Sequence, residues 1–110
     1  MKIKVSVEGG VSVFSVDGKL NFESQRILHK EFKKNATSHG SKYIFDLSGV
    51  TVIDSIGLAL LVAMNRTVVA MDGKFCVVLK EGAAREPVLI TSLNALFPVF
   101  DDIQSAHKYM

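Results

Sequence analysis

Two short apolar segments on either side of a long apolar helix constrain the fold more than any other feature of this sequence. Residues 43–47 and residues 74–79 are short and rich in β-formers, as expected of strands that are covered on both faces. Between them a helix is predicted over about residues 55–71, ending at Asp72-Gly73, where the glycine can adopt the left-handed cap. A strand, a helix and a strand joined this closely predict a right-handed parallel crossover.

The N-terminal part of the chain has the period of two that is typical of strands. Lys2–Glu8 alternates polar residues with isoleucine and valine, Gly9-Gly10 supplies a turn, and residues 11–17 are again rich in β-formers. We therefore expect a β-hairpin here. The central strand is expected to break at Ser48-Gly49 and to be followed by a loop over residues 50–53.

Three further helices and an edge strand complete the expected elements. They are a helix that Ser24 caps and that ends at about Asn35, before His39-Gly40; a shorter helix with Pro87 in its first turn and its end at about Leu93; an edge strand over residues 96–100, where Pro98 is tolerated; and a helix that Asp101 or Asp102 caps and that ends at about Lys108.

These elements predict one α/β domain over residues 1–110. We expect a mixed sheet of four or five strands, built from the N-terminal hairpin plus parallel strands, with about four helices packed mainly on one face. Hydrophobic residues make up 48% and charged residues 22%, which excludes disorder. The longest apolar run, residues 58–64, is far shorter than the ~20 residues that span a bilayer. We therefore expect a cytoplasmic protein with no direct membrane insertion.

The charges and the single cysteine indicate no special partner or chemistry. The net charge is only +2, and the basic group formed by Arg26, Lys30, Lys33 and Lys34 is typical of a solvated helix face. No aromatic interleaving or nucleic-acid motif accompanies it, so we expect no nucleic-acid partner. Cys76 lies inside an apolar run and is expected to be a reduced core cysteine.

A catalytic or metal site is not indicated. The three histidines, His29, His39 and His107, have no partner at ligand spacing and are expected at the surface. Asp101-Asp102 fits a helix cap better than an acid–base pair, because adjacent side chains point in different directions. We therefore predict no enzyme activity, no metal and no cofactor.

The long helix has more apolar surface than one core requires. Leu60, Leu61, Met64, Val68 and Met71 fall in one arc that should face the sheet. Leu58, Val62 and Val69 fall on the side that carries Asn65. These three are either buried under neighbouring loops or the C-terminal helix, or they dock a partner.

The start of this helix carries the most suggestive functional residue. Either Asp54 or Ser55 can cap the helix, and Gly57 thins its first turn so that another backbone can approach. A serine beside an apolar surface is a candidate for phosphorylation, which would add nearly two negative charges and change how well that surface docks.

Three motifs in order resemble those of the STAS domain of the bacterial anti-sigma factor antagonist type. They are Gly18-Lys19-Leu20-Asn21, the strand that continues as Asp46-Leu47-Ser48-Gly49-Val50, and Asp54-Ser55-Ile56-Gly57-Leu58. The resemblance implies a four- or five-stranded mixed sheet with helices packed on it. It also implies that Ser55 is phosphorylated by a serine kinase of the histidine-kinase-like ATPase fold, often the same protein as the anti-sigma factor, and dephosphorylated by a PP2C-like phosphatase.

In such a protein the unmodified form binds and sequesters a regulator. We expect Asp54, Gly57 and Asn21 to support the site, and Ile56, Leu58 and Val62 to contact the partner. Two residues depart from the family pattern: Asn21 replaces an acid, and Ile56 replaces a small residue. A monomer is expected, because Ser55 must be reachable.

Two other functions remain open at this point. Gly57-Leu58-Ala59-Leu60-Leu61 also resembles the small STAS subunit of lipid-transporting ABC complexes, in which the helix would be a permanent interface. The other open function is that of an enzyme or a nucleotide-binding module.

Overall fold

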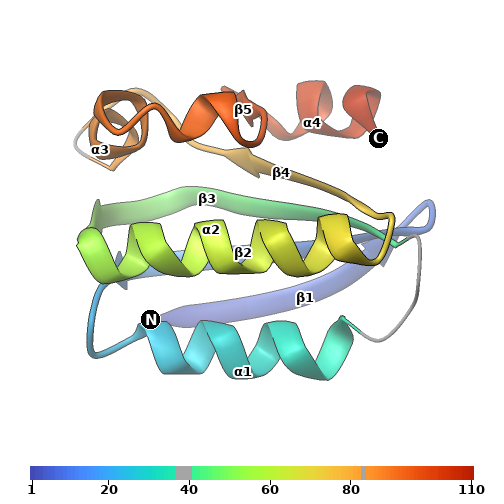
Figure 1. Ribbon diagram of the computed structural model, residues 1–110, viewed down its shortest axis with the longest axis horizontal. Helices are drawn as coiled ribbons and strands as arrows, with labels where there is room; N and C mark the ends of the chain where they lie inside the picture. The colour runs from blue at the N-terminus through green and yellow to red at the C-terminus, as the bar shows by residue number, and fades with distance from the viewer. Residues whose placement is uncertain (37–40, 83) are drawn as a thin grey trace.

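The protein is an α/β domain with a five-stranded sheet, which confirms the predicted fold class. The computed structural model describes residues 1–36, 41–82 and 84–110. The strands lie in the order β1-β2-β3-β4-β5 (Figure 1). Along the chain the elements are β1 (Lys2–Glu8), β2 (Val11–Leu20), α1 (Gln25–Asn35), β3 (Lys42–Ile53), α2 (Ser55–Ala70), β4 (Lys74–Val78), α3 (Arg85–Ile90), the 3₁₀ turn η1 (Leu93–Ala95), β5 (Val99–Phe100) and α4 (Ile103–Tyr109).

The sheet is mixed. β1 pairs antiparallel with β2, while β2, β3, β4 and β5 run parallel. The predicted hairpin is confirmed, and its turn uses positive φ at Gly9 and Gly10, a conformation that costs glycine little. The predicted parallel β3–α2–β4 unit is also confirmed. β1 is left as an edge strand, on which Lys2 and Lys4 are exposed.

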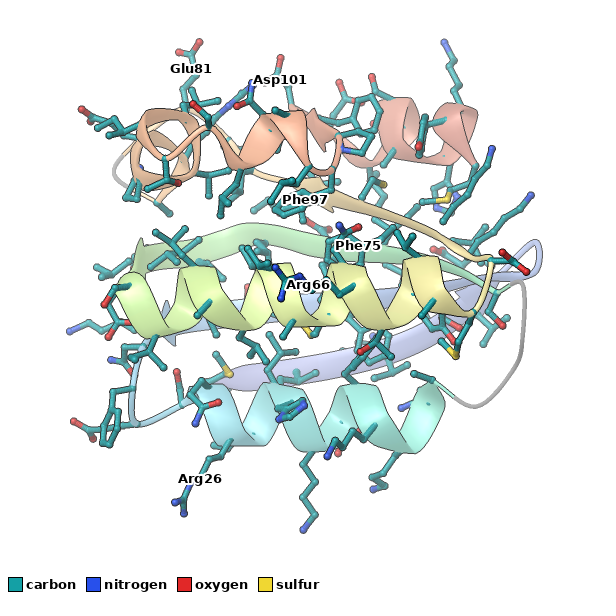
Figure 2. All side chains as sticks on the ribbon, in the orientation of Figure 1. Arg26, Arg66, Phe75, Glu81, Phe97 and Asp101 are labelled. Carbon is teal, nitrogen blue, oxygen red and sulfur yellow. The ribbon has the colours of Figure 1, made fainter. Side chains whose placement is uncertain are left out.

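The two faces of the sheet carry cores of different size. The front face, which α1 and α2 cover, holds the larger core, in which Phe14 and Phe45 stack with their ring centroids 4.7 Å apart. Phe75 on β4 meets Phe97 in the same core, edge to face at 5.3 Å (Figure 2). The back face holds a smaller core that α4 covers through Ala106. Helices thus pack mainly on one face, as predicted.

Cys76 belongs to the back core and is fully buried. Burial raises the pKa of its thiol to about 12, because the thiolate would lose its hydration. The prediction of a reduced core cysteine is confirmed, and the thiol is neutral at physiological pH.

The prediction that β3 ends before Ser48-Gly49 is wrong. The strand continues to Ile53, and residues 50–53 pair with β2 instead of forming a loop. Register shifts on either side of Asp17 let the two strands stay paired past the glycine. A side chain at Gly49 would overlap the Asp17 carboxylate, so here the glycine permits a close approach within the sheet.

The C-terminal cap of α2 also differs from the prediction. The left-handed residue is Asp72, with φ of 57°, and not Gly73. The amide of Asp72 donates to the carbonyl of Val69, and that of Gly73 donates to the carbonyl of Val68, which is the Schellman pattern. A side chain at Gly73 would overlap the Ser41 carbonyl, so the glycine is required for packing against the start of β3.

Three smaller predictions, one helix cap and the ranges of one helix and one strand, are also wrong in detail. Ser24 precedes α1 as predicted, but its hydroxyl does not cap the helix. α3 begins two residues before Pro87 and ends at Ile90, so Leu93 falls in η1. The edge strand is shorter than predicted and contains only Val99–Phe100. The predicted cap of α4 by Asp102 is confirmed, whereas His39-Gly40 lie outside the described residues.

Candidate functional site

Asp54 joins three parts of the chain at the start of α2. Its Oδ1 accepts a hydrogen bond from the amide of Gly57 at 2.9 Å, which caps the helix. Its Oδ2 accepts a hydrogen bond from the amide of Phe22 at 3.0 Å, in the connection between β2 and α1. Its own amide donates to the carbonyl of Leu20 at 3.2 Å. The first turn of α2 is thereby tied to the β2–α1 connection.

The hydrogen bonds to the Asp54 carboxylate lower its pKa. The bond from the Gly57 amide is the largest cause, desolvation acts in the opposite direction, and the bond from the Phe22 amide lowers the pKa further. The carboxylate is therefore ionised at neutral pH. A second negative charge placed on the next residue would meet a like charge.

Asn21 stabilises the turn that leads into α1. Its Oδ1 accepts from the amide of Ser24 at 3.1 Å, and its own amide donates to Ser24 Oγ at 3.0 Å. The Ser24 hydroxyl donates to the carbonyl of Lys19 at 2.5 Å. Asn21 therefore stabilises the conformation of the connection beside Asp54. Ser24 forms hydrogen bonds within this connection and does not cap α1.

The backbone that approaches Gly57 belongs to this chain. Gly57 is buried, and a Cβ there would lie 2.5 Å from the Leu20 carbonyl oxygen and 3.0 Å from the Leu20 side chain. The expectation that Gly57 thins the helix for a second backbone is correct in its geometry, but the structure fills that space internally. The glycine lets α2 start directly against the end of β2.

Ser55 is the first residue of α2 and is exposed. Two large apolar side chains at this helix start are also exposed, Phe22 by 70% and Ile56 by 40%, and Val52 near the end of β3 is exposed by 43%. The starts of α1 and α2 and the end of β3 lie at the same end of the sheet (Figure 1). We call Phe22, Ser55 and Ile56 the α2-start patch.

Sequence reasoning missed Phe22 and Val52. Val52 was expected in a loop, and its exposure follows from its place at the end of a longer β3. Phe22 was passed over because the contact between its amide and Asp54 spans 32 positions of sequence. A large aromatic residue inside an otherwise polar turn is the signal that could have identified it.

The remaining apolar side of α2 is divided between core and surface. Leu60, Leu61, Met64 and Val68 are buried as predicted, and Met71 is half-buried. Leu58 and Val62 are half-buried and pack against the front core, whereas Val69 is 59% exposed. Asn65 donates from Nδ2 to the Leu96 carbonyl at 3.5 Å.

The other candidates have structural partners. Asp101 forms an ion pair with Arg85, and Asp102 accepts a hydrogen bond from the amide of Ser105 at 2.8 Å. The two carboxylates therefore have separate structural roles. His107 is half-buried and lies 3.4 Å from Glu8. Over residues 1–36, 41–82 and 84–110, histidine, cysteine, aspartate and glutamate form no group of three that could hold a metal ion.

α2, the longest helix, has 16 residues, and none of the helices in the described ranges combines the length and apolarity needed to cross a membrane.

The fold and the motif at its α2 start define a STAS domain. The family model for the STAS domain matches residues 2–106, and the chain belongs to this family. It is 25% identical over 104 residues to the anti-sigma-F factor antagonist RsfB of Mycobacterium tuberculosis, covering 94% of this chain and 84% of the relative. The resemblance inferred from the three motifs is thus confirmed.

Solved structures agree with this assignment. The crystal structure of an anti-sigma factor antagonist from Mycobacterium paratuberculosis has 28% sequence identity and a TM-score of 0.91, covering 98% of this chain and 92% of the other. The anti-sigma factor antagonist SpoIIAA in its unphosphorylated form has the same fold, with a TM-score of 0.78 at 14% identity over 98% of this chain and 96% of the other.

Proposed function

We propose that this protein is an anti-sigma factor antagonist in a partner-switching pathway. Its unphosphorylated form binds a serine kinase that acts as the anti-sigma factor, and phosphorylation of Ser55 releases that partner. The observation that carries the proposal is the exposed Ser55 at the first residue of α2, between Asp54, whose carboxylate holds the amide of the exposed Phe22, and the exposed Ile56. The similarity to proteins named anti-sigma factor antagonists supports it.

In this proposal the chain supplies the acceptor hydroxyl, and the kinase supplies the chemistry. Ser55 Oγ forms a bond to the γ-phosphorus of ATP, the bond to the ADP oxygen breaks, and the hydroxyl proton leaves to a base on the kinase. A kinase of the histidine-kinase-like ATPase fold fits this role, and a PP2C-like phosphatase returns the serine. The protein itself acts in the cytoplasm as a binding module and not as an enzyme.

The phosphate changes binding far more than folding. At the N-terminus of α2 the helix dipole stabilises a phosphate by about 0.3 to 1 kcal/mol, while the ionised Asp54 carboxylate opposes it. At a docked apolar surface the dianion must be desolvated or left unpaired, which costs several kcal/mol. A loss of about 4 kcal/mol corresponds to roughly a thousandfold weaker affinity.

Phosphorylation by purified kinases tests the assignment of Ser55. Each serine kinase of the histidine-kinase-like ATPase fold from the same genome is incubated with this protein and ATP, and intact mass reports the added phosphate. We expect one kinase to modify the wild type and not Ser55→Ala. Ser48→Ala, which removes another exposed serine, is the matched control and should be modified normally. Equal labelling of Ser55→Ala would contradict the assignment.

A binding measurement tests the switch. The same kinase should bind the wild type and Ser55→Ala, whereas Ser55→Asp should bind roughly a hundredfold or more weakly. Circular dichroism of Ser55→Asp should match the wild type. Full affinity of a folded Ser55→Asp protein would remove the electrostatic basis of the switch.

A constitutive STAS subunit of a lipid-transporting ABC complex is the second candidate. It is favoured by a second exposed apolar group, Leu89, Ile90 and Leu96, which a phosphoserine switch does not require. This function predicts stable co-purification with a transporter ATPase. Ser55→Asp should leave that complex intact, which separates the two candidates.

A further inference from the structure

The outer side of α1 forms a stripe that begins at Phe22. The amide of Gln25 donates to the carbonyl of Asn21 at 2.9 Å, the i to i−4 bond of an α-helix, so the helical path reaches back to Phe22. Phe22, Arg26, Lys30 and Lys33 are spaced by four, four and three residues and are all exposed. Figure 2 shows Arg26 projecting from α1 away from the sheet. We call these four residues the α1 stripe.

The positive charge of the protein is concentrated on this helix. α1 carries four cations and one carboxylate, a net +3, whereas the whole chain carries +2, which leaves −1 for the rest. The one carboxylate, Glu31, lies 3.6 Å from Lys34, which is outside the stripe. Such an asymmetric surface attracts an acidic partner and orients it before contact.

The stripe is continuous with the α2-start patch. Phe22 belongs to both surfaces, and its amide is held by Asp54, the residue next to Ser55. A partner that covers Ser55 therefore meets Phe22 first and then the cations of α1. An exposed aromatic ring beside a charged border has the composition of an interface anchor with its rim.

We propose that the partner bound at Ser55 also contacts the α1 stripe through an acidic surface that contains an apolar socket for Phe22. This inference rests on the proposed function and specifies its partner. Phe22 slows dissociation of the bound partner. The cations Arg26, Lys30 and Lys33 raise the association rate. A protein is favoured over a lipid surface because Phe22, where the stripe starts, is held by Asp54 beside the switch residue Ser55. In addition, α1 buries its own apolar side, Leu28 and Phe32, in the front core.

Binding kinetics of variants test the proposal, with the kinase that modifies Ser55 as the probe. Phe22→Ala should weaken affinity about 30-fold, mainly through a faster off-rate, as expected of an aromatic hot spot. Val7→Ala is the matched control, because Val7 is 72% exposed at the hairpin, and it should bind within about twofold of the wild type.

The charges are tested by reversing two of them. Lys30→Glu with Lys33→Glu should slow the on-rate about tenfold at low salt, and the difference should shrink as salt is added. Lys4→Glu with Lys108→Glu makes the same change in net charge on β1 and α4, away from the stripe, and should have a much smaller effect. Circular dichroism checks that all variants fold.

The outcomes separate this inference from the proposed function. If Ser55→Asp loses binding while both stripe variants bind like the wild type, the partner does not use the stripe and the proposed function stands. If no such kinase modifies or binds the wild type, the function fails and the inference fails with it. If reversal of the lysines abolishes binding to vesicles of phosphatidylglycerol and phosphatidylcholine but leaves the kinase on-rate unchanged, the stripe binds lipid and the inference is overturned.

Discussion

Two helices of this protein begin with the same cap but use it differently. At the start of α2 the Asp54 carboxylate accepts from the amide three residues later at 2.9 Å, and at the start of α4 Asp102 does so at 2.8 Å. Hydrogen bonding lowers the pKa of both carboxyl groups. The caps differ in reach, because Asp54 also holds the Phe22 amide across 32 positions of sequence, whereas Asp102 accepts its bond from Ser105 within its own turn.

The residues that follow the two caps differ as well. Ser55 after Asp54 is exposed, whereas Ile103 after Asp102 is half-buried and packs against the back core. α4 therefore uses its cap to close a helix over the sheet. α2 uses its cap to join two loops and to hold a hydroxyl and an aromatic residue at the surface.

The largest expected difference concerns the third residue after each cap. Gly57→Ala would place a methyl group 2.5 Å from the Leu20 carbonyl and should lower the free energy of unfolding by about 3 kcal/mol, although alanine favours helices elsewhere. Ser105→Ala at the equivalent position of α4 should cost no more than about 1 kcal/mol. Urea unfolding measures both, and similar losses would show that the two helix starts are packed alike.

The caps themselves should rank next. Asp54→Ala removes bonds to two separate elements and should lower the urea midpoint more than Asp102→Ala, which removes a local cap. It should also speed hydrogen exchange at the Phe22 amide, because that amide loses its acceptor. Unchanged exchange at Phe22 would mean that Asp54 is only a local cap.

Acid should weaken both caps in the same direction. Both pKa values are lowered from 3.8, so each carboxylate contributes stability that is present above its unfolded pKa and is lost as pH falls through its lower folded pKa. We expect constant stability from neutral pH to about pH 5 and a decline below about pH 4. Asp54→Asn and Asp102→Asn should each flatten that decline, which urea unfolding at several pH values would measure.

The smallest expected effect on stability is at Ser55 itself. Ser55→Ala should change the free energy of unfolding by less than about 0.5 kcal/mol, because the side chain is exposed and Asp54 already caps the helix. A thermal melt of the variant beside the wild type measures this. A loss well above 1 kcal/mol would show that Ser55 is a structural residue.

Local signals predicted the capped starts of α2 and α4, while the cap of α1 and contacts between distant segments escaped them. An aspartate before an apolar periodic run indicated both caps. The bond from Phe22 to Asp54 could not be predicted, because it depends on how the β2–α1 connection folds back onto α2. The extension of β3 past Ser48-Gly49 was missed for the same reason, since pairing with β2 overrides the local tendency of a serine and a glycine to break a strand.

The family motif predicted a serine at the start of a helix, and the structure adds what surrounds it. The sequence does not show that Gly57 fits against Leu20, because a glycine after a helix cap has several possible reasons. Nor does it show how the apolar residues of α2 divide between core and surface, since a helical wheel does not show which loops lie nearby.

The open edge of β1 bears on aggregation at high protein concentration. Its outer backbone groups could template the sheet of a second molecule, and exposed Val7 would favour such growth. Lys2 and Lys4 oppose it, because fibril-like stacking of identical strands in register would bring their ammonium groups together and repel the incoming copy. The same two lysines therefore act as gatekeepers against aggregation.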